Sequence, residues 1–340
     1  MQGQIFKIHS DFYYVHTPDN VYECKIRDVL KKRKDSIVVG DFVELEQINE
    51  NSKQAFVSKV LPRKTYIPRP KVANIDQIVI VSAIKEPDLD FEQLNRYLCF
   101  CEYYKLTPVL CFNKNDLEGE EEIIAQIKKI YEPLKYKILF TSALEGNGID
   151  EFKKLLKNKI TVLCGSSGVG KSSLINAICP GLQLKTKQVS QKSERGTHTT
   201  RHCEIISVAK NSQIVDTPGF SQLKFDFLMP AEVGLLFREI INIQKKYGAC
   251  KFSDCIHEHE TGCRITEHFD LIDETRYKSY LQFIKEAKEY KKQITYGGKK
   301  TETRSKIVHN KEITKISSKK RQISRRKSNQ SIHKETTEDA

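Results

Sequence analysis

The sequence lacks any apolar run long enough to cross a membrane, and this absence excludes one broad class of proteins. A membrane-spanning helix needs roughly 18 consecutive apolar residues, and no segment of the 340-residue chain approaches that length. The opening segment, MQGQIFKIHS, also lacks the basic and then apolar pattern of a signal peptide. We therefore expect a soluble cytoplasmic protein with no membrane partner.

A disulfide framework is not expected either, although the chain contains ten cysteines. Thiols stay reduced in the cytoplasm, so disulfides between them are rare there. Several cysteines lie in apolar runs and are predicted to be small core residues: Cys99, Cys101, Cys111 and Cys164. Three further cysteines cluster between residues 250 and 263 and need another explanation.

Acidic residues are scarce near the C-terminal end, where basic residues accumulate. The chain has a formal net charge of +13. Between Lys291 and Lys327 there are fourteen lysines and arginines against two glutamates, so this stretch carries nearly all the excess. Such a concentration of positive charge predicts a polyanionic partner. Nucleic acid is favoured over a membrane because no apolar anchor accompanies the charge.

No repeat of fixed period appears, and the apolar pattern changes along the chain. Residues 1–68 contain five short segments with partial alternation between turn signals, which predict a small β-barrel of the oligonucleotide-binding type. A small β domain without a ligand remains an alternative. The segment PRKTYIPRP at the end of this region is expected to act as a stiff linker, since proline interrupts strand pairing.

The remainder of the chain falls into three parts. Residues 69–225 alternate continuous apolar strands with helices, which is typical of an α/β domain with a largely parallel sheet. Residues 226–292 are helical by spacing and flank the cysteine cluster. In residues 293–340 Ser, Thr, Lys and Arg dominate, and we expect no fixed fold there without a partner. The sequence therefore predicts a multidomain protein with a barrel, an α/β domain, a helical domain and a basic tail.

A phosphate-binding motif lies in the middle of the chain. The segment GSSGVGKSS fits the pattern G-x4-G-K-[ST], and it lies between a buried strand and a helix. Backbone N–H groups of such a loop surround phosphate oxygens. The Lys171 ammonium is expected at the β- and γ-phosphates, and the Ser172 hydroxyl at Mg²⁺. The predicted phosphate-binding residues are Gly165, Ser166, Ser167, Gly168, Val169, Gly170, Lys171, Ser172 and Ser173.

A second motif, D-T-P-G at residues 216–219, ends a later buried strand. By itself it could be a plain turn. Beside a phosphate loop, Asp216 is expected to hold the Mg²⁺ ion through water, and the Gly219 N–H to bond the γ-phosphate.

Two segments predict which base is bound. The run FNKND resembles the N-K-x-D guanine motif of the GTPase superfamily, here Asn113, Lys114, Asn115 and Asp116. The Asp116 carboxylate can accept hydrogen bonds from guanine N1–H and the N2 amino group, whereas adenine would leave it unpaired. Asn113 is expected near N7, and the Lys114 stem against the base and ribose.

The run SALEG resembles the superfamily element that follows the N-K-x-D motif. In this element Ser142 and Ala143 are the matching residues, with the Ala143 N–H at guanine O6. Together the two motifs favour GTP over ATP.

These motifs occur in an unusual order, because an ordinary GTPase begins with the phosphate loop and ends with the base motifs. All the elements are present, so we interpret the domain as circularly permuted. With this order the chain resembles the RsgA (YjeQ/YloQ) family, the circularly permuted GTPases of small ribosomal subunit biogenesis. The resemblance covers roughly residues 1–290 and includes a first-switch pattern, G-T-H-T-T at residues 196–200.

The residue after D-T-P-G bears on hydrolysis. Many GTPases place a water-orienting glutamine there, but this chain has Phe220, so slow intrinsic turnover is expected. The resemblance implies that His198 is the catalytic residue, and that Thr200, with Thr199 as the alternative, completes the Mg²⁺ shell. Arg195 is a weaker candidate for charge neutralisation.

The cysteine cluster offers three thiolates and one imidazole, the donor set of a closed tetrahedral structural zinc site. The predicted ligands are Cys250, Cys255, His257 and Cys263. His259 is a rival imidazole, and the resemblance favours His257. Reduced cysteines packed between helices are the alternative.

The leading hypothesis is a monomeric GTPase that binds the small (30S) ribosomal subunit and its rRNA, hydrolyses GTP under stimulation by the subunit, and then dissociates. A GTP-dependent RNA-binding scaffold with little turnover is the second hypothesis. A P-loop kinase or ATPase is a third, which Asp116 disfavours. The basic tail is either a cationic arm for ribosomal RNA or a solvated charged end.

Overall fold

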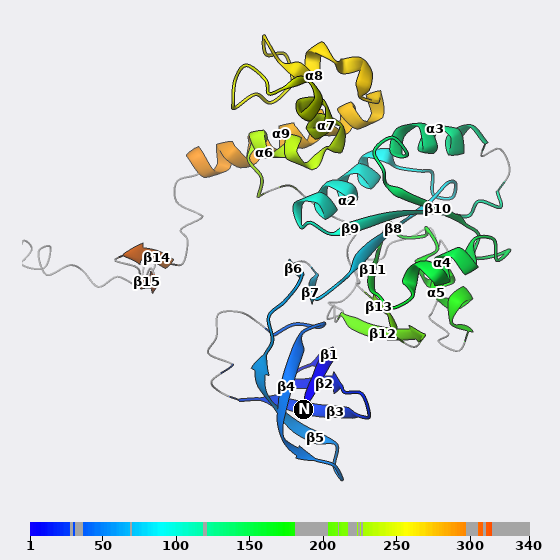
Figure 1. The fold of residues 1–340 in the computed structure, drawn as a ribbon, viewed down its shortest axis with the longest axis vertical. Helices are drawn as coiled ribbons and strands as arrows, with labels where there is room; N and C mark the ends of the chain where they lie inside the picture. Colours follow the sequence, from blue (N-terminus) through cyan, green and yellow to red (C-terminus); the bar gives the residue numbers. More distant parts are fainter. Residues whose placement is uncertain are drawn as a thin grey trace, which may run out of the picture. The chain divides into compact units, whose positions relative to one another are not determined.

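The computed structural model describes residues 1–27, 30, 37–68, 70–117, 121–180, 203–209, 211–216, 223, 225, 227–296, 305–308 and 311–314 (Figure 1). These residues fall into two units, Met1–Ala287 and Lys288–Ala340, and each unit is described by itself. Within the described ranges, no helix combines the length and the apolar character needed to span a bilayer.

Five strands form the N-terminal barrel, as the alternating pattern predicted. They are β1 Gln2–His9, β2 Phe12–His16, β3 Val21–Ile26, β4 Phe42–Asn49 and β5 Gln54–Val60. The barrel closes because β4 pairs antiparallel with both β5 and β1, while β3 pairs parallel with β5. Its core holds alternate apolar side chains, among them Ile5, Val15, Val43 and Val57.

The expected linker contains a short hairpin instead. Strand β6 (Tyr66–Pro68) pairs antiparallel with β7 (Lys71–Ala73). Proline is tolerated here because Pro68 lies at the end of its strand, where a missing N–H costs least. The hairpin forms because Ile67 and Val72 are fully buried in the core of the central domain.

The central domain is built on a sheet of six strands. They are β8 Gln77–Ala83, β9 Thr107–Asn113, β10 Lys137–Thr141, β11 Ile160–Cys164, β12 Glu204–Ala209 and β13 Ser212–Asp216. Among the described residues of this domain, four helices occur between the strands: α2 Phe91–Tyr103, α3 Glu121–Tyr131, α4 Ile149–Leu156 and α5 Lys171–Ile178. The strand order is β10-β9-β8-β11-β13-β12, parallel except for β12.

The barrel and the central sheet are hydrogen-bonded to each other. Strand β1 pairs antiparallel with β12 at Lys7 and Glu204, so one sheet of eleven strands runs through both domains. An ion pair between the Lys7 Nζ and the Glu204 Oε1, 3.2 Å apart, lies at this pairing.

After the central domain the chain becomes helical, as predicted. The elements are α6 Pro230–Val233, η2 Gly234–Leu236, α7 Arg238–Tyr247, α8 Arg264–Glu267, η3 Phe269–Leu271 and α9 Glu274–Tyr296. Their apolar faces share one core, which includes Phe225, Phe237 and Phe283 and also Cys99 from α2.

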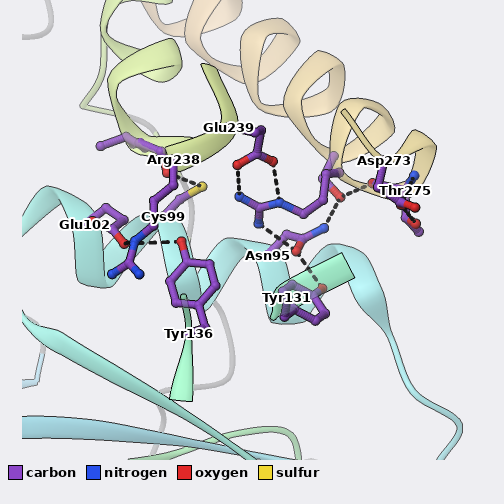
Figure 2. A network of polar contacts seen from close by, with 12 residues as sticks. Asn95, Cys99, Glu102, Tyr131, Tyr136, Arg238, Glu239, Asp273 and Thr275 are labelled. Atoms are coloured by element: carbon purple, nitrogen blue, oxygen red, sulfur yellow. Dashed lines mark hydrogen bonds and ion pairs between the residues drawn. The ribbon is translucent and has the colours of Figure 1, made fainter. Parts of the chain in front are cut away.

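A buried polar network joins α2 to these helices (Figure 2). The Arg276 guanidinium donates to both oxygens of Glu239, at 2.7 and 3.1 Å, and to the Asn95 Oδ1 at 2.8 Å. The Tyr131 hydroxyl donates to the same Asn95 oxygen at 2.8 Å. Burial alone would lower the pKa of Arg276, but attraction to Glu239 raises it, so the guanidinium stays charged. A buried charge held this way fixes the geometry of its surroundings, because losing either partner is costly.

The basic tail contains a second short hairpin, although we expected no fixed fold after residue 293. Strand β14 (Ser305–Val308) pairs antiparallel with β15 (Lys311–Thr314). Both strands contain β-branched residues, which favour extended backbone. In these eight residues the local preference for extended backbone prevails over the high charge of the surrounding sequence.

All ten cysteines are free, in agreement with the prediction that they form no disulfides. The four that were expected in the core are buried: Cys99, Cys101, Cys111 and Cys164. Burial raises the pKa of Cys111 to about 12, so this thiol stays neutral and behaves as a small apolar side chain.

Candidate functional site

The predicted guanine motif, the S-A element, the phosphate loop and the start of the D-T-P-G motif lie at one edge of the central sheet. Because β9, β10, β11 and β13 run parallel, their carboxyl ends meet at the same edge. Asn113 ends β9, Thr141 ends β10 directly before Ser142, Cys164 ends β11 directly before Gly165, and Asp216 ends β13. Ligands of open α/β sheets bind at this edge.

The phosphate loop follows β11 and leads into α5. Gly170, the residue before the helix, has a φ of +92°, and a Cβ there would lie 2.2 Å from the Asn113 Nδ2. Only glycine permits both the left-handed backbone and this close approach. The Lys171 ammonium donates to the carbonyl oxygens of Gly165 and Ser166, at 2.8 and 2.6 Å, and so lies over the loop.

Asn113 connects three of the predicted segments. Its Nδ2 donates to the carbonyl oxygen of Val169 in the phosphate loop, at 2.9 Å. Its Oδ1 accepts from the Ala143 N–H and from the Thr141 hydroxyl, each at 3.2 Å. The side chain is only 1% exposed, so these bonds are made in a dry environment where an unpaired amide would be costly. The base motif, the S-A element and the phosphate loop therefore form one hydrogen-bonded unit.

The rest of the N-K-x-D motif lies in the turn that follows β9. Lys114 has a left-handed backbone, with a φ of 66°, and its ammonium donates to the Glu86 carbonyl oxygen. The Asn115 N–H donates to the Thr141 carbonyl oxygen at 3.2 Å. Asp116 is half-buried in the same turn.

The S-A element is organised by Ser142, which is fully buried. Its hydroxyl accepts from the Glu145 N–H at 3.0 Å, and its N–H donates to the Asn147 carbonyl oxygen at 2.9 Å. These bonds close a tight loop and leave Ala143 half-buried at the sheet edge.

Part of the predicted site lies outside the described residues, namely His198, Thr200 and Gly219, together with Arg195, Thr199 and Phe220. Asp216 is described by its backbone, which ends β13 beside the phosphate-loop strand.

The strand order agrees with a permuted chain. The phosphate-loop strand β11 lies between β8 and β13, yet the base-motif strands β9 and β10 precede it in sequence. The base motifs and the phosphate loop thus follow neighbouring strands of one sheet, although their order in the sequence is shuffled.

The cysteine cluster forms a compact donor set between α7 and α8. The ligand atoms of Cys250, Cys255, His257 and Cys263 all lie within 4.8 Å of one another. The His257 Nδ1 is 3.6, 3.3 and 3.4 Å from the three sulfur atoms in that order. The rival imidazole, His259, is exposed and does not belong to the group.

These distances fit a tetrahedral zinc ion. Zn–S bonds of about 2.3 Å and Zn–N bonds of about 2.0 Å require donor-to-donor separations of roughly 3.5 to 3.8 Å. The nitrogen-to-sulfur distances of 3.3 to 3.6 Å and the 4.0 Å separation of the Cys250 and Cys263 sulfurs bracket this range, and all four ligand atoms lie within 4.8 Å of one another. Four protein ligands leave no open position, as in structural sites.

Surrounding residues hold the ligand loop in place. The Glu260 carboxylate accepts from the N–H groups of Ile256, Glu258 and His259. Burial alone would raise the pKa of Glu260, but these backbone hydrogen bonds lower it. The Tyr277 hydroxyl donates to the His257 carbonyl oxygen at 2.9 Å. Sequence motifs identify neither Glu260 nor Thr141, since neither residue belongs to a recognised pattern.

Three family models match the chain. Residues 60–226 match the model described as RsgA GTPase, and residues 2–57 match the RsgA N-terminal domain. Residues 160–311 match a model described as 50S ribosome-binding GTPase.

Individual relatives are similar over most of their length. The small ribosomal subunit biogenesis GTPase RsgA of Caldanaerobacter subterraneus subsp. tengcongensis is 41% identical over 296 residues, which cover 86% of this chain and 97% of that protein. The protein of the same name from Bacillus pumilus is 40% identical over 300 residues, covering 85% and 98%.

Solved structures are similar too. The crystal structure of YjeQ from Thermotoga maritima has a TM-score of 0.72 at 33% identity, covering 84% of this chain and 98% of that one. The crystal structure of YloQ, a circularly permuted GTPase, has a TM-score of 0.68 at 30% identity, covering 85% and 95%. The permuted strand order, the joined guanine and phosphate motifs and these similarities together show that the chain belongs to the RsgA family of small ribosomal subunit biogenesis GTPases, which hydrolyse GTP.

Proposed function

We propose that this protein binds the immature small ribosomal subunit late in its assembly, hydrolyses GTP when the subunit stimulates it, and dissociates after hydrolysis. The observation that carries the proposal is the bond between Asn113 and Val169, because it joins guanine recognition to the phosphate loop in a single site. The relatives named above as small ribosomal subunit biogenesis GTPases support the choice of partner.

In this proposal the residues that follow β9 and β10 hold the guanine base, and the loop that follows β11 holds the phosphates. Asp116 accepts from the guanine N1–H and N2 amino groups, and the Lys114 stem packs on the base and ribose. The Ala143 N–H, which donates to the Asn113 Oδ1 in this structure, turns to guanine O6 when the base is bound. The backbone of Gly165–Ser173 holds the phosphates, with Lys171 at the β- and γ-phosphates.

Magnesium fits the donor chemistry of the phosphate end. The Ser172 hydroxyl, the Thr200 hydroxyl and the Asp216 carboxylate are oxygen donors, which Mg²⁺ prefers. When bound, the ion would supply charge neutralisation at the phosphate oxygens.

Hydrolysis needs an oriented water, and Phe220 cannot orient one because a phenyl ring neither donates nor accepts a hydrogen bond. We assign this role to His198, positioned when the subunit orders the first switch. The Gly219 N–H donates to the γ-phosphate in the same state.

The cysteine cluster is proposed to hold one zinc ion with a structural role. Its geometry fits a tetrahedral site, and a metal ion there would cross-link the loop between α7 and α8 and so stabilise the C-terminal helices. The basic tail is proposed to contact ribosomal RNA. Since its proposed partner is the ribosomal subunit, the protein is expected to act in the cytoplasm, and we propose that it does so as a monomer.

A phosphate-release assay tests the proposed function. Purified protein is mixed with GTP alone, with small subunits, or with large subunits, and phosphate is measured over time. Stimulation by small subunits alone is the expected result. Equal, slow release in all three mixtures, with GTP-dependent subunit binding retained, would instead favour the RNA-binding scaffold.

A further inference from the structure

The loop between α7 and α8 (Figure 1) carries the four predicted metal ligands, and its backbone turns sharply at one of them, His257. His257 has a φ of 57°, in the left-handed region that a non-glycine residue adopts only with support from its surroundings. A left-handed residue within a turn lets neighbouring N–H groups point to the same side and form a concave site for an anion. The shape of this turn therefore depends on an acceptor for its N–H groups.

The Glu260 carboxylate is that acceptor. Its Oε1 accepts from the Ile256 N–H at 2.9 Å, and its Oε2 accepts from the N–H groups of Glu258 and His259, at 2.9 and 3.2 Å. These donors lie before and after His257 in the sequence, so one carboxylate binds the backbone on both sides of a predicted ligand. Hydrogen bonds to a charged acceptor are stronger than those between neutral groups, and three of them hold the turn in its left-handed shape.

Glu260 is also bonded to the residue that supplies another ligand. The Cys263 N–H donates to the Glu260 carbonyl oxygen at 3.2 Å. The Glu260 carboxylate itself is not a ligand, because the group of possible ligand atoms found among the described residues consists of the His257 imidazole and three cysteine sulfurs. Glu260 thus contacts the backbone at two ligands without belonging to the donor set.

Groups from α9 and η2 contact the same turn. The Tyr277 hydroxyl donates to the His257 carbonyl oxygen at 2.9 Å, and the Tyr280 hydroxyl donates to the Ile256 carbonyl oxygen at 2.7 Å. A Cβ on Gly234 would lie 3.3 Å from the His257 Nε2, so the imidazole packs closely on the backbone of η2. The N–H groups, the carbonyl groups and the ring of this turn are therefore all held by protein groups.

We infer that Glu260 is a positioning residue for the metal: its carboxylate holds the His257 turn in the shape that brings the imidazole to the three sulfurs, and so raises the affinity for zinc. This inference rests on the proposed zinc site and goes beyond it, since the four ligands alone do not explain what holds them together. Ligands that are already in place lose less conformational freedom when the ion binds. Residues that orient ligands without touching the metal typically change metal affinity by about ten- to a hundredfold.

The test measures the zinc affinity of the full-length, zinc-loaded protein by titration with a chromophoric chelator of known affinity. Glu260→Gln keeps the size of the side chain but replaces one acceptor oxygen with an amide donor, and it should weaken zinc binding about tenfold. Glu260→Ala removes all three bonds to the turn and should weaken zinc binding further, toward about a hundredfold.

Glu267→Gln is the matched control, because it removes the same charge from α8, the helix that follows the ligand loop. The Glu267 carboxylate is exposed and accepts from the Arg264 Nη1 at 2.6 Å, within the same helix. Exposed ion pairs of this kind contribute little, so the zinc affinity of this variant should stay within about twofold of the wild-type value.

Cobalt(II)-exchanged protein separates a positioning role from a ligand role. The visible absorption of tetrahedral cobalt reports which atoms bind it, thiolate sulfurs above all. Once saturated with cobalt, both Glu260 variants should give the wild-type spectrum because all four ligands remain, whereas Cys250→Ala should change it. Circular dichroism of the saturated proteins checks that each variant is folded.

Weaker zinc binding by Glu260→Gln and Glu260→Ala, with normal affinity in Glu267→Gln and an unchanged cobalt spectrum, supports the inference. Wild-type affinity in both Glu260 variants overturns it and leaves the proposed zinc site standing. Equal weakening by Glu267→Gln also overturns it, because the effect is then one of net charge. A changed cobalt spectrum in the Glu260 variants overturns it by making Glu260 a ligand. Wild-type protein that binds no zinc removes the proposed metal site and the inference together.

Discussion

The Asn113 side chain donates a hydrogen bond to the carbonyl oxygen of Val169 at 2.9 Å, although the two residues are 56 positions apart. The donor belongs to the predicted guanine motif and the acceptor to the phosphate loop. A Cβ on residue 170 would lie 2.2 Å from the same Asn113 nitrogen, so the loop can approach the amide this closely only because residue 170 is glycine. The pairing shows that the permuted chain brings the predicted guanine motif and the phosphate loop together in space.

Asn113→Ala should weaken binding of GDP and GTP by similar factors. The substitution removes three buried hydrogen bonds and leaves the Ala143 N–H and the Val169 carbonyl without this partner. A loss of about 1–3 kcal/mol, or roughly five- to 150-fold in affinity, follows from the usual cost of such groups. Asn147→Ala is the control, because the amide of that side chain donates to the exposed Glu145 carboxylate and not to the phosphate loop. Calorimetric titration with GDP measures both, and an unchanged affinity for Asn113→Ala would contradict the role given to this amide.

His257→Ala should lose the metal, whereas His259→Ala should keep it. The first histidine places its Nδ1 within 3.6 Å of all three cysteine sulfurs, and the second is exposed outside the group. Metal analysis of the purified variants is expected to give about one zinc per chain for wild type and His259→Ala. Zinc loss should also lower the unfolding temperature, because metal binding stabilises the folded state. Full zinc content in His257→Ala would show that another donor completes the site.

The parts of the fold set by local apolar pattern were predictable from the sequence. The five barrel strands follow from alternation, and β8 and β9 follow from continuous apolar runs that are buried on both faces. The β1–β12 pairing was not predictable, because the sequence of an edge strand does not indicate which distant strand will pair with it. Asn95 and Arg276 are buried in the fold but look like ordinary polar positions in a helical pattern.

The residues of the candidate site also fall into two groups: those that a sequence motif identifies and those that only the fold identifies. Asn113 was predicted because it lies in an N-K-x-D motif, and Cys263 because its cluster offers three thiolates and an imidazole and resembles the zinc motif of the family. The Thr141 hydroxyl donates to the Asn113 side chain, and the Glu260 carboxylate accepts from the N–H groups of Ile256 and Glu258 on either side of the predicted ligand His257. Neither Thr141 nor Glu260 has a fixed spacing in a motif, so only the three-dimensional arrangement identifies them.

His198→Ala should keep GTP affinity and lose most of the turnover that small subunits stimulate. The expectation follows from Phe220, which leaves the usual water-orienting position without a polar group. A loss of about a hundredfold in the stimulated rate is the order of magnitude for a general base or water-orienting group. Unchanged stimulated turnover would remove His198 from the mechanism.

Truncation after residue 292 should reduce the salt dependence of small-subunit binding. The removed tail carries most of the net positive charge. The slope of log affinity against log salt should become shallower by about 0.7 to 0.9 for each phosphate that the truncated protein no longer neutralises. Affinities of the full-length and truncated proteins are compared across salt concentrations. Identical slopes would mean that the tail is a solvated end that does not touch RNA.

The most direct measurement of the central claim is nucleotide competition against a fluorescent GDP, with the wild-type protein and Asp116→Ala. A single guanine site assembled from the ends of β9, β10 and β11 predicts one site per chain, displacement by GTP but not by ATP, and loss of this preference in Asp116→Ala, since the guanine donors then have no partner. Equal displacement by GTP and ATP from the wild-type protein would contradict the claim.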